Sequence, residues 1–169
     1  MVRPMFRKVL AGALSALMVT LGGCDLGARA SASSGIAHFL EAVQKDDRAA
    51  FEAALDRPAL REDLRRQLAA LGSQTGLVVE GGASEFALDR MITPHAFHMV
   101  EARTGQALPV APTAAQVALL MKVTDHGHVC VRDLKRDRCL MTFAKEKGVW
   151  RLVAMQATDL VIAVTPAAK

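Results

Sequence analysis

The sequence predicts an α+β domain in which helices come first and an antiparallel sheet follows. In the first half, Leu60, Leu64, Leu68 and Leu71 recur at the spacing of one helical face. After Pro109, short runs rich in β-branched and other apolar residues alternate with turns that contain glycine. Helices followed by strands are typical of an α+β arrangement. At 169 residues the chain has room for one such domain.

The chain begins with the features of a secretory signal. Arg3, Arg7 and Lys8 precede an uncharged run over residues 9–21, and these are the charged and apolar regions of a signal peptide. The run is shorter than the roughly 20 apolar residues that span a bilayer. We therefore predict a signal peptide over residues 1–23 rather than a transmembrane anchor.

The end of this segment carries a second signal. Leu21, Gly22, Gly23 and Cys24 resemble the lipobox of bacterial lipoproteins. The resemblance implies that the signal is removed just before Cys24 and that Cys24 carries two or three acyl chains, which are enough for stable anchoring. An ordinary signal followed by an unrelated cysteine is the alternative. Asp25 resembles the residue that keeps lipoproteins of enteric bacteria at the inner membrane. The prediction is a lipid-anchored protein of the cell envelope that faces the periplasm, at the inner rather than the outer membrane.

Removal of the signal changes the charge of the protein. The whole chain carries a net charge of +4, and three of these charges leave with the signal, so the mature part is close to neutral at +1. A nucleic-acid partner favours a concentrated basic face. We therefore expect no nucleic-acid binding.

The segment after Cys24 is rich in Ala, Ser and Gly, so residues 24–35 are predicted as the lipidated cysteine and a flexible tether. The α+β domain is predicted over residues 36–158 and a C-terminal tail over 159–169. The first helix of the domain has an apolar face from Ile36 to Val43. Asp47 and Asp56 are the expected N-caps of a second and a third helix, and the third ends at Gly72.

Two more helices and then the sheet are predicted for the rest of the domain. The helices cover residues 85–92 and 93–103, the second beginning at Thr93-Pro94. The strands cover 117–124, 128–132, 138–144 and 149–155 and form an antiparallel meander. The turn at 145–148 fits a type I turn with a glycine bulge, or a two-residue loop that shifts the register by one residue.

Two cysteines remain in the predicted domain, Cys130 and Cys139. An exported domain matures where disulfides persist. In a hairpin centred between Leu134 and Lys135 the two cysteines lie directly opposite each other, with Cβ atoms about 4.5–5.5 Å apart. We predict a disulfide between them. A metal or redox role is the alternative, although the spacing differs from the two-residue spacing of a redox dithiol.

Several motifs of the first half are similar to those of one family. The stretch FLEAVQKDDRAAFEAALDRPALREDLRRQL, the turn at residues 91–94 and the strand at 150–153 resemble a family of proteobacterial envelope proteins that is defined only as a domain of unknown function. The resemblance spans residues 36–155 and brings no catalytic residues with it. A looser likeness is to the nuclear-transport-factor-2 type of fold. It implies a curved, cone-like sheet that wraps a helix and often leaves a cavity.

The titratable residues do not predict a reaction centre. A metal site needs three or four convergent ligands, and the histidines supply only local pairs or singles: His38, His95, His98, His126 and His128. The chain has no tyrosine, and Asp89, Asp125 and Asp133 are expected in caps, turns or surface positions. We predict no metal, no cofactor and no catalytic residue, and the sequence leaves open whether the protein is an enzyme.

The remaining candidates are residues that favour an apolar binding site. Met121, Met141, Met155 and Trp150 either fill the core or line a cavity for an apolar ligand such as an acyl chain, or a groove for a partner segment. We therefore predict a non-enzymatic binding or assembly role at the cell envelope, with the membrane and an envelope protein or apolar ligand as partners. The alternative is a cone-fold carrier of a lipid or small molecule, or an enzyme of the isomerase or dehydratase type.

Overall fold

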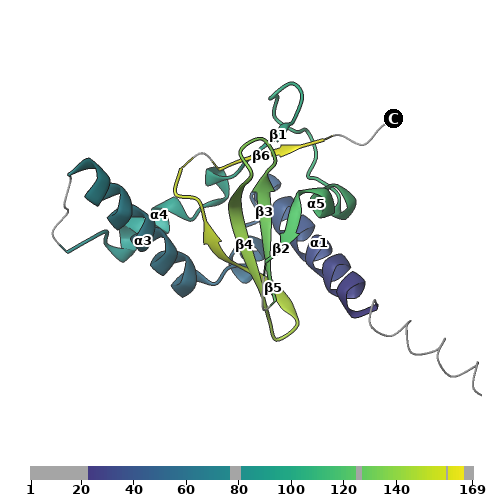
Figure 1. Ribbon diagram of the computed structural model, residues 1–169, viewed down its shortest axis with the longest axis horizontal. Helices are drawn as coiled ribbons and strands as arrows, with labels where there is room; N and C mark the ends of the chain where they lie inside the picture. The colour runs from purple at the N-terminus through teal and green to yellow at the C-terminus, as the bar shows by residue number, and fades with distance from the viewer. Residues whose placement is uncertain (1–22, 77–80, 125–126, 159, 166–169) are drawn as a thin grey trace, which may run out of the picture.

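The computed structural model describes residues 23–76, 81–124, 127–158 and 160–165 (Figure 1). The predicted signal, apart from Gly23, lies outside these residues, as do Asp125 and His126. The elements, in order, are α1 (Gly23–Gln44), α2 (Arg48–Ala53), α3 (Arg57–Thr75), α4 (Glu85–Met91), the 3₁₀ helix η1 (Pro94–Ala96), β1 (His98–Glu101), α5 (Ala114–Leu120), β2 (Met121–Val123), β3 (His128–Asp133), β4 (Arg138–Glu146), β5 (Val149–Met155) and β6 (Val161–Val164).

These elements form the α+β arrangement that the sequence predicts. Strands β2, β3, β4 and β5 make a four-stranded antiparallel sheet in that order, and β1 pairs with β6 in a small parallel sheet. In the part of the chain that the structure describes, the sheet neither closes nor curls on itself. The cone-like sheet is therefore not seen, because each strand of the larger sheet pairs only with its neighbours and β2 and β5 remain edges.

Helix α1 is the centre of the fold. Phe39 lies on its sheet-facing side, and its ring centroid is 5.4 Å from that of Phe143 on β4, 5.5 Å from that of Phe51 on α2 and 5.3 Å from that of Phe97. These rings belong to one buried apolar cluster that joins the helices to the sheet. The predicted apolar face from Ile36 to Val43 is thus the face that the core covers.

The segment predicted as a flexible tether is helical, since α1 begins at Gly23 and runs through it. Ala32 and Ser33 are buried, and Trp150 Nε1 donates a hydrogen bond to Ser31 Oγ at 3.2 Å. A Cβ at Gly35 would lie 3.1 Å from Trp150 Cβ. Small residues, which read as a tether in the sequence, are what allow Trp150 to approach the helix. At the other end, the predicted tail contains β6, whose Ile162 and Val164 are fully buried.

Two further segments differ from the prediction. Residues 117–120, expected in a strand, form most of α5, whose start carries a capping box between Thr113 and Gln116. Residues 93–103, expected in a helix, form η1 and then β1. Buried Phe97 and Met99 flank exposed His98, and this alternation suits a strand. His95 and His98 therefore do not share a helical face.

The turns place the hairpins at two ends of the sheet. Glu146 pairs with Val149, so the β4–β5 turn is the two-residue loop, with positive φ at Lys147 and Gly148 (47° and 88°) as a type I′ turn requires. Because the sheet is antiparallel throughout, the end of β2, the start of β3 and the β4–β5 turn lie at one end, and the β3–β4 turn lies at the opposite end (Figure 1).

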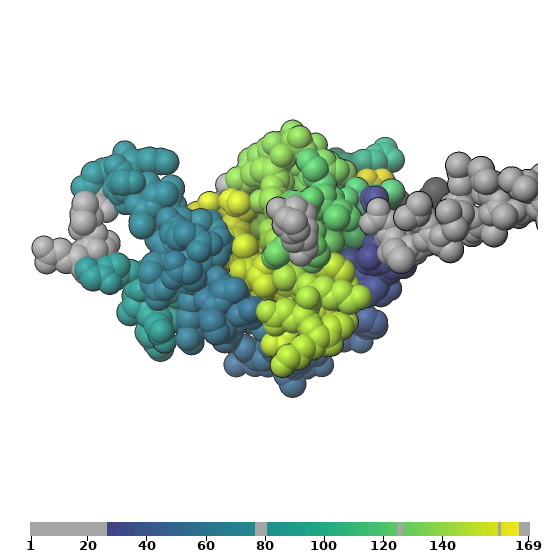
Figure 2. All heavy atoms as spheres, turned by 60° about the horizontal axis from the view of Figure 1, so that its bottom comes forward, coloured from purple at the N-terminus to yellow at the C-terminus, as the bar shows by residue number. Residues whose placement is uncertain are grey.

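Helices α3 and α4 form an arm beside the edge strand β5, to the left of the sheet in Figures 1 and 2. Leu152 N donates to Ala54 O at 2.9 Å, and Asp56 N donates to Leu152 O at 3.0 Å, so the chain entering α3 pairs with β5. Further along, Gln67 Nε2 donates to Met155 O at 2.7 Å, and Asp63 Oδ2 accepts from Met155 N at 3.2 Å. The edge of β5 is thus covered by polar contacts from α3.

Candidate binding groove

The predicted lipidation site lies at the start of the domain. Cys24 and the predicted sorting residue Asp25 are in the first turn of α1 (Gly23–Gln44). None of the helices within the described residues combines the length and the apolar character that crossing a membrane requires. Cleavage before Cys24 would therefore leave the modified residue directly on the helix that carries the core.

The predicted disulfide is present, with the Cα atoms of Cys130 and Cys139 5.7 Å apart. The predicted register is wrong. Cys139 pairs with Arg132 because the turn is centred one residue later than expected, and Cys130 pairs with Thr142 because a bulge between Val131 and Arg132 shifts the register by one residue more. The turn is centred between Lys135 and Arg136, since Asp133 pairs with Arg138. Asp133 Oδ1 accepts from the backbone N–H of Lys135 at 2.9 Å, an Asx turn that starts at this aspartate.

The four candidate cavity residues are buried in the shared apolar cluster. Met121, Met141, Met155 and Trp150 each expose less than a tenth of their surface. Met141 and Met155 also border a shallow depression of about 170 Å³ beside Cys139. The structure thus brings these two together with one half of the disulfide, while Met121 and Trp150 lie elsewhere in the core.

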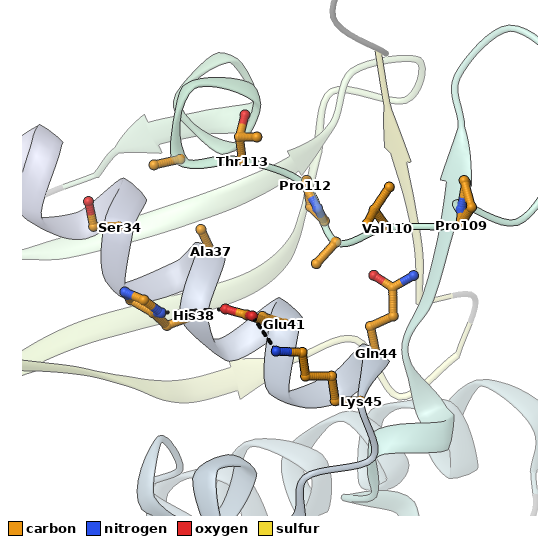
Figure 3. Close-up of a pocket in the computed structure, with 12 residues that line it drawn as sticks. Ser34, Ala37, His38, Glu41, Gln44, Lys45, Pro109, Val110, Pro112 and Thr113 are labelled. Carbon is orange, nitrogen blue, oxygen red and sulfur yellow. Dashed lines mark hydrogen bonds and ion pairs between the residues drawn. The ribbon is translucent and has the colours of Figure 1, made fainter.

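The described surface carries an apolar groove that the sequence did not indicate (Figure 3). Its volume is about 470 Å³. One wall is α1 and the other is the chain that leads into α5. The lining consists of Ser34, Ala37, His38, Glu41, Gln44, Lys45, Pro109, Val110, Ala111, Pro112, Thr113 and Ala114.

The second wall keeps its shape for local reasons. Pro109 and Pro112 fix the backbone φ angle and donate no hydrogen bond, so the segment between them stays extended. Gln44 Nε2 donates to Leu108 O at 3.0 Å and ties the start of this wall to α1. Thr113 then caps α5. Pro112 is buried, whereas the side chain of Val110 is 72 % exposed and stands at the mouth of the groove.

Gln44 also supplies a buried polar atom. Its Oε1 accepts no hydrogen bond from any described residue, and Figure 3 shows it turned from the end of α1 toward the space below Val110. A buried acceptor that stays unpaired costs about 1–3 kcal/mol. The groove wall therefore holds an acceptor that a donor seated deep in the groove would satisfy.

The outer rim of the groove is charged. His38, Glu41 and Lys45 follow one face of α1 at spacings of three and four residues. Lys45 Nζ donates to Glu41 Oε1 at 2.6 Å, and His38 Nδ1 lies 3.7 Å from Glu41 Oε2. The hydrogen bond from Lys45 holds the pKa of the Glu41 carboxyl below its usual range and raises the pKa of Lys45. Glu41 and Lys45 therefore form an ion pair along the rim.

The groove continues beyond Gln44. This residue also borders a second depression, of about 570 Å³, which reaches Phe97, Met99 and Leu108. His95 and His98 border both this depression and a third one, of about 510 Å³, next to Met155 and Leu160. The first and second depressions share Gln44, and the second and third share His95 and His98, an arrangement that suits an extended ligand more than a compact one.

The titratable residues that the sequence singled out lie in separate places. Across the ranges that the structure describes, no three His, Cys, Asp or Glu side chains are arranged to hold a metal ion. Asp89 forms ion pairs with Arg57 and Arg61, and Asp133 caps a turn. His95 Nε2 lies 4.0 Å from Asp46 Oδ1 at the surface.

Comparisons with models of known protein families, with curated proteins and with solved structures find no match.

The groove was missed because its walls come from distant parts of the chain. Ala37 and Val110 are 73 positions apart. The only local sign is the pair of prolines at 109 and 112, which marks extended chain but not what it faces.

Proposed function

We propose that the protein is a lipid-anchored envelope protein that faces the periplasm and binds an extended segment of a partner protein in the groove between α1 and residues 109–114. The role is one of binding or assembly, without catalysis. On this proposal the chain is a member of the proteobacterial envelope family that its motifs resemble, and it is held at the inner membrane in keeping with Asp25.

The observation that carries the binding role is the groove itself. Its floor is formed by small and apolar side chains such as Ala37 and Pro112, and its rim by His38, Glu41 and Lys45. Few polar groups around an apolar floor are typical of binding sites. Val110, an apolar side chain left 72 % exposed at the mouth, is covered when a partner occupies the groove.

The anchor and the groove lie on one element. Cys24 is in the first turn of α1, and Ser34 to Lys45 on the same helix form one groove wall. A helix transmits position rigidly, whereas a Gly- and Ser-rich tether does not. The lipid anchor therefore holds the groove at a defined height above the membrane.

A carrier or an enzyme of the isomerase or dehydratase type receives less support. Both rest on a cavity inside a cone-like sheet, and Met121 and Trp150, expected around it, are packed in the core. Within the described residues, the open groove is one place that an acyl chain could occupy. Native mass spectrometry of protein extracted from membranes separates the two uses, because an acyl-chain carrier retains a lipid-sized adduct and a peptide-binding groove does not.

Crosslinking in cells tests the groove. A photoreactive phenylalanine analogue in place of Val110 should trap one protein in near-stoichiometric yield. Phe86 on α4 is the matched control, because its side chain is also 72 % exposed but lies on the arm, away from the groove. Ser34→Trp, which places an indole in the groove from an exposed position, should lower the yield at position 110 without lowering Tm. The same products from positions 110 and 86 would contradict the proposal.

The anchor is tested separately. Globomycin, which blocks the lipoprotein signal peptidase, should cause a heavier precursor to accumulate, and Cys24→Ser should release the protein from the membrane fraction. An unchanged mature size with normal export of Cys24→Ser would refute lipidation. Fractionation of Asp25→Ser beside the native protein tests the inner-membrane assignment, which an unchanged distribution would contradict.

A further inference from the structure

One end of the sheet, which we call the anchor-side end, combines exposed apolar and basic side chains close to the start of α1. It contains the C-terminal end of β2, the first residue of β3, the β4–β5 turn and, next to Arg29 of α1, the last turn of α5. Its exposed apolar residues are Leu119, Val123 and Val149, at 68 %, 48 % and 52 % exposure, and its basic residues are Arg29, Lys122, Lys145 and Lys147.

Two contacts fix the position of this end relative to the predicted lipidation site. Trp150, the second residue of β5, donates its hydrogen bond to Ser31 in the first half of α1. Arg29 donates to Ala118 O in the last turn of α5 at 3.4 Å. Ser31 follows Cys24 by seven residues, about 10 Å along a helix that rises about 1.5 Å per residue. Figure 2, which turns this end toward the viewer, shows the β4–β5 turn in front with the start of α1 at its right.

The basic residues of this end have few acidic partners in the structure. None of the ion pairs formed between described residues includes Lys122, Lys145 or Lys147. Lys145 Nζ lies 5.9 Å from the centre of the Trp150 ring. Glu146 is the acidic residue of the β4–β5 turn, and Asp25 and Asp125 add two acidic positions in the sequence. The end is therefore amphipathic rather than strongly positive.

We propose that the anchor-side end docks on the headgroup region of the bilayer that holds Cys24. The proposal rests on the proposed lipid anchor. Leu119, Val123 and Val149 enter the membrane–water interface, because removal of apolar side chains from water lowers the free energy. The lysines extend their ammonium groups to anionic headgroups while their methylenes remain at the interface.

Docking would set the orientation of the binding groove. Ser34 and Lys45 follow Cys24 by 10 and 21 residues, which is roughly 15 and 30 Å along the helix axis. The groove thus remains clear of the headgroups and accessible from the periplasm. The β3–β4 turn, at the opposite end of the sheet, points away from the membrane.

The two ends of the sheet supply a matched test. Val149 and Leu134 are 52 % and 53 % exposed, and each lies at a hairpin turn of the same sheet, at opposite ends. Each is replaced in turn by cysteine in the mature full chain, with Cys130 and Cys139 oxidised. The new cysteine is labelled with an environment-sensitive fluorophore. The labelled protein is then reconstituted in vesicles of phosphatidylcholine and phosphatidylglycerol that contain a lipid-borne quencher. The label at 149 should be blue-shifted and quenched, and the label at 134 should show neither effect. Equal quenching at the two positions would overturn the proposal.

A charge-reversal pair tests the headgroup contact. Lys145→Glu/Lys147→Glu should lower the docking equilibrium constant, read from quenching at 149, at least about fivefold, because each basic side chain near an anionic surface contributes about that factor. Arg103→Glu/Lys135→Glu, two exposed residues away from this end, should leave it unchanged. If the label at 149 is blue-shifted in native membranes but not in protein-free vesicles, the anchor-side end contacts an acidic protein. That result would overturn the proposed contact with lipid.

Failure of the anchor is distinguishable from failure of docking. Intact mass, measured first, reports whether the protein carries acyl chains. If it carries none, the anchor proposal fails, and Cys24→Ser protein, labelled only at 149 or at 134, is mixed with the vesicles. Quenching at 149 and not at 134 then still supports the docking surface, and quenching at neither position rejects it.

Discussion

Helices α1 and α3 are the two long helices among the described residues, and they are held in different ways. Helix α1 places a continuous apolar face in the core, with Phe39 among three other aromatic rings. Helix α3 fully buries only Leu60 and Leu64. It is positioned instead by hydrogen bonds to β5 and by ion pairs with α4.

The difference follows from what each helix covers. Helix α1 covers the apolar face of the sheet. Burial there stabilises the fold in proportion to the apolar area removed from water, and it does not depend on an exact position of the helix. Helix α3 lies beside the edge of β5, where exposed backbone groups would otherwise offer a template for another strand. Covering an edge calls for directional hydrogen bonds, and Asp63 and Gln67 provide them. We infer that α1 determines stability and carries one wall of the proposed binding groove, whereas α3 and α4 protect the edge.

The largest expected effect is on α1. Phe39→Ala removes the ring that contacts Phe51, Phe97 and Phe143, and its side chain is 2 % exposed. We expect the free energy of unfolding to fall by about 3–5 kcal/mol, because the lost burial is joined by a cavity. Urea titration followed by circular dichroism measures it. Leu71→Ala on α3, at a side chain 43 % exposed, is the control and should change stability by less than about 0.5 kcal/mol. Equal losses would remove the distinction between the two helices.

The disulfide gives the next largest effect and sharpens the comparison within the sheet. Replacing Cys130 and Cys139 together by Ala opens a loop with a sequence separation of nine residues. We expect a loss of about 2.5 kcal/mol, since the unfolded chain regains the entropy that the bridge removes. Reductant should lower the stability of the native protein by a similar amount and leave the double variant unchanged. Hydrogen exchange shows which part of the protein the bridge stabilises. If only the amides of the β3–β4 hairpin lose protection in the double variant, and global stability falls little, the hairpin opens while the rest of the domain stays folded.

Much of the helical half could be predicted from sequence because its signals are local. Asp47 Oδ1 accepts from Ala50 N at 3.1 Å and Asp56 Oδ1 accepts from Ala59 N at 3.0 Å, so both predicted N-caps are confirmed. The strands β3, β4 and β5 could also be predicted, because polar segments bound their apolar runs, with Gly127 before β3 and Gly148 between β4 and β5. Helix α5 was missed because its apolar run suits a helix or a strand equally well. The capping box of Thr113 and Gln116 was the available sign.

The register and the groove depend on contacts between distant residues and could not be predicted in this way. A turn centred one residue later leaves the pattern of apolar residues almost unchanged, yet it shifts the partner of Cys139 from Cys130 to Arg132. An extra residue at the bulge then places Thr142 opposite Cys130. The hydrogen bond between Ser31 and Trp150 likewise joins residues that are 119 positions apart in the chain. Small residues before a core helix therefore do not by themselves indicate a tether.

Two glycines of α1 test where its close packing begins. A Cβ at Gly35 would lie 3.1 Å from Trp150, whereas nothing lies within 4 Å of a Cβ at Gly27. Gly35→Val should lower the free energy of unfolding by about 1–2 kcal/mol through overpacking. Gly27→Val, the same change on the same helix, should stay within about 0.5 kcal/mol of the native protein, since valine is a slightly better helix former than glycine. Thermal unfolding of both variants reports the difference. If both glycines tolerate valine, Trp150 and α1 are less closely packed than the structure indicates.

The smallest expected effect concerns the arm and appears only in part of the pH range. Arg61 donates to both carboxylate oxygens of Asp89, at 2.8 and 2.7 Å, and Arg57 donates at 3.1 Å. The hydrogen bonds from Arg61 hold the pKa of Asp89 below its usual range, and Arg57 does the same for the pKa of Glu52. A carboxyl group whose pKa is lower in the folded protein stabilises the fold above its unfolded pKa. This contribution decreases as the pH falls below about 4 and is lost once the pH has passed the folded pKa.

Asp89→Asn should therefore lower the free energy of unfolding by about 0.5–1 kcal/mol at pH 7, the range of partly exposed ion pairs. In acid, the variant and the native protein should have more nearly equal stability. Urea unfolding of both proteins at pH 7 and pH 3 measures this difference. Glu62→Gln, in which the exposed ion pairs with Arg65 and Arg66 are lost, is the control and should show a smaller effect at both pH values. If the loss in Asp89→Asn persists undiminished at pH 3, the carboxylate charge is not what joins α4 to α3. The arm would then depend on buried Leu64 and Leu88, as α1 depends on Phe39, and the two regions would be held in the same way.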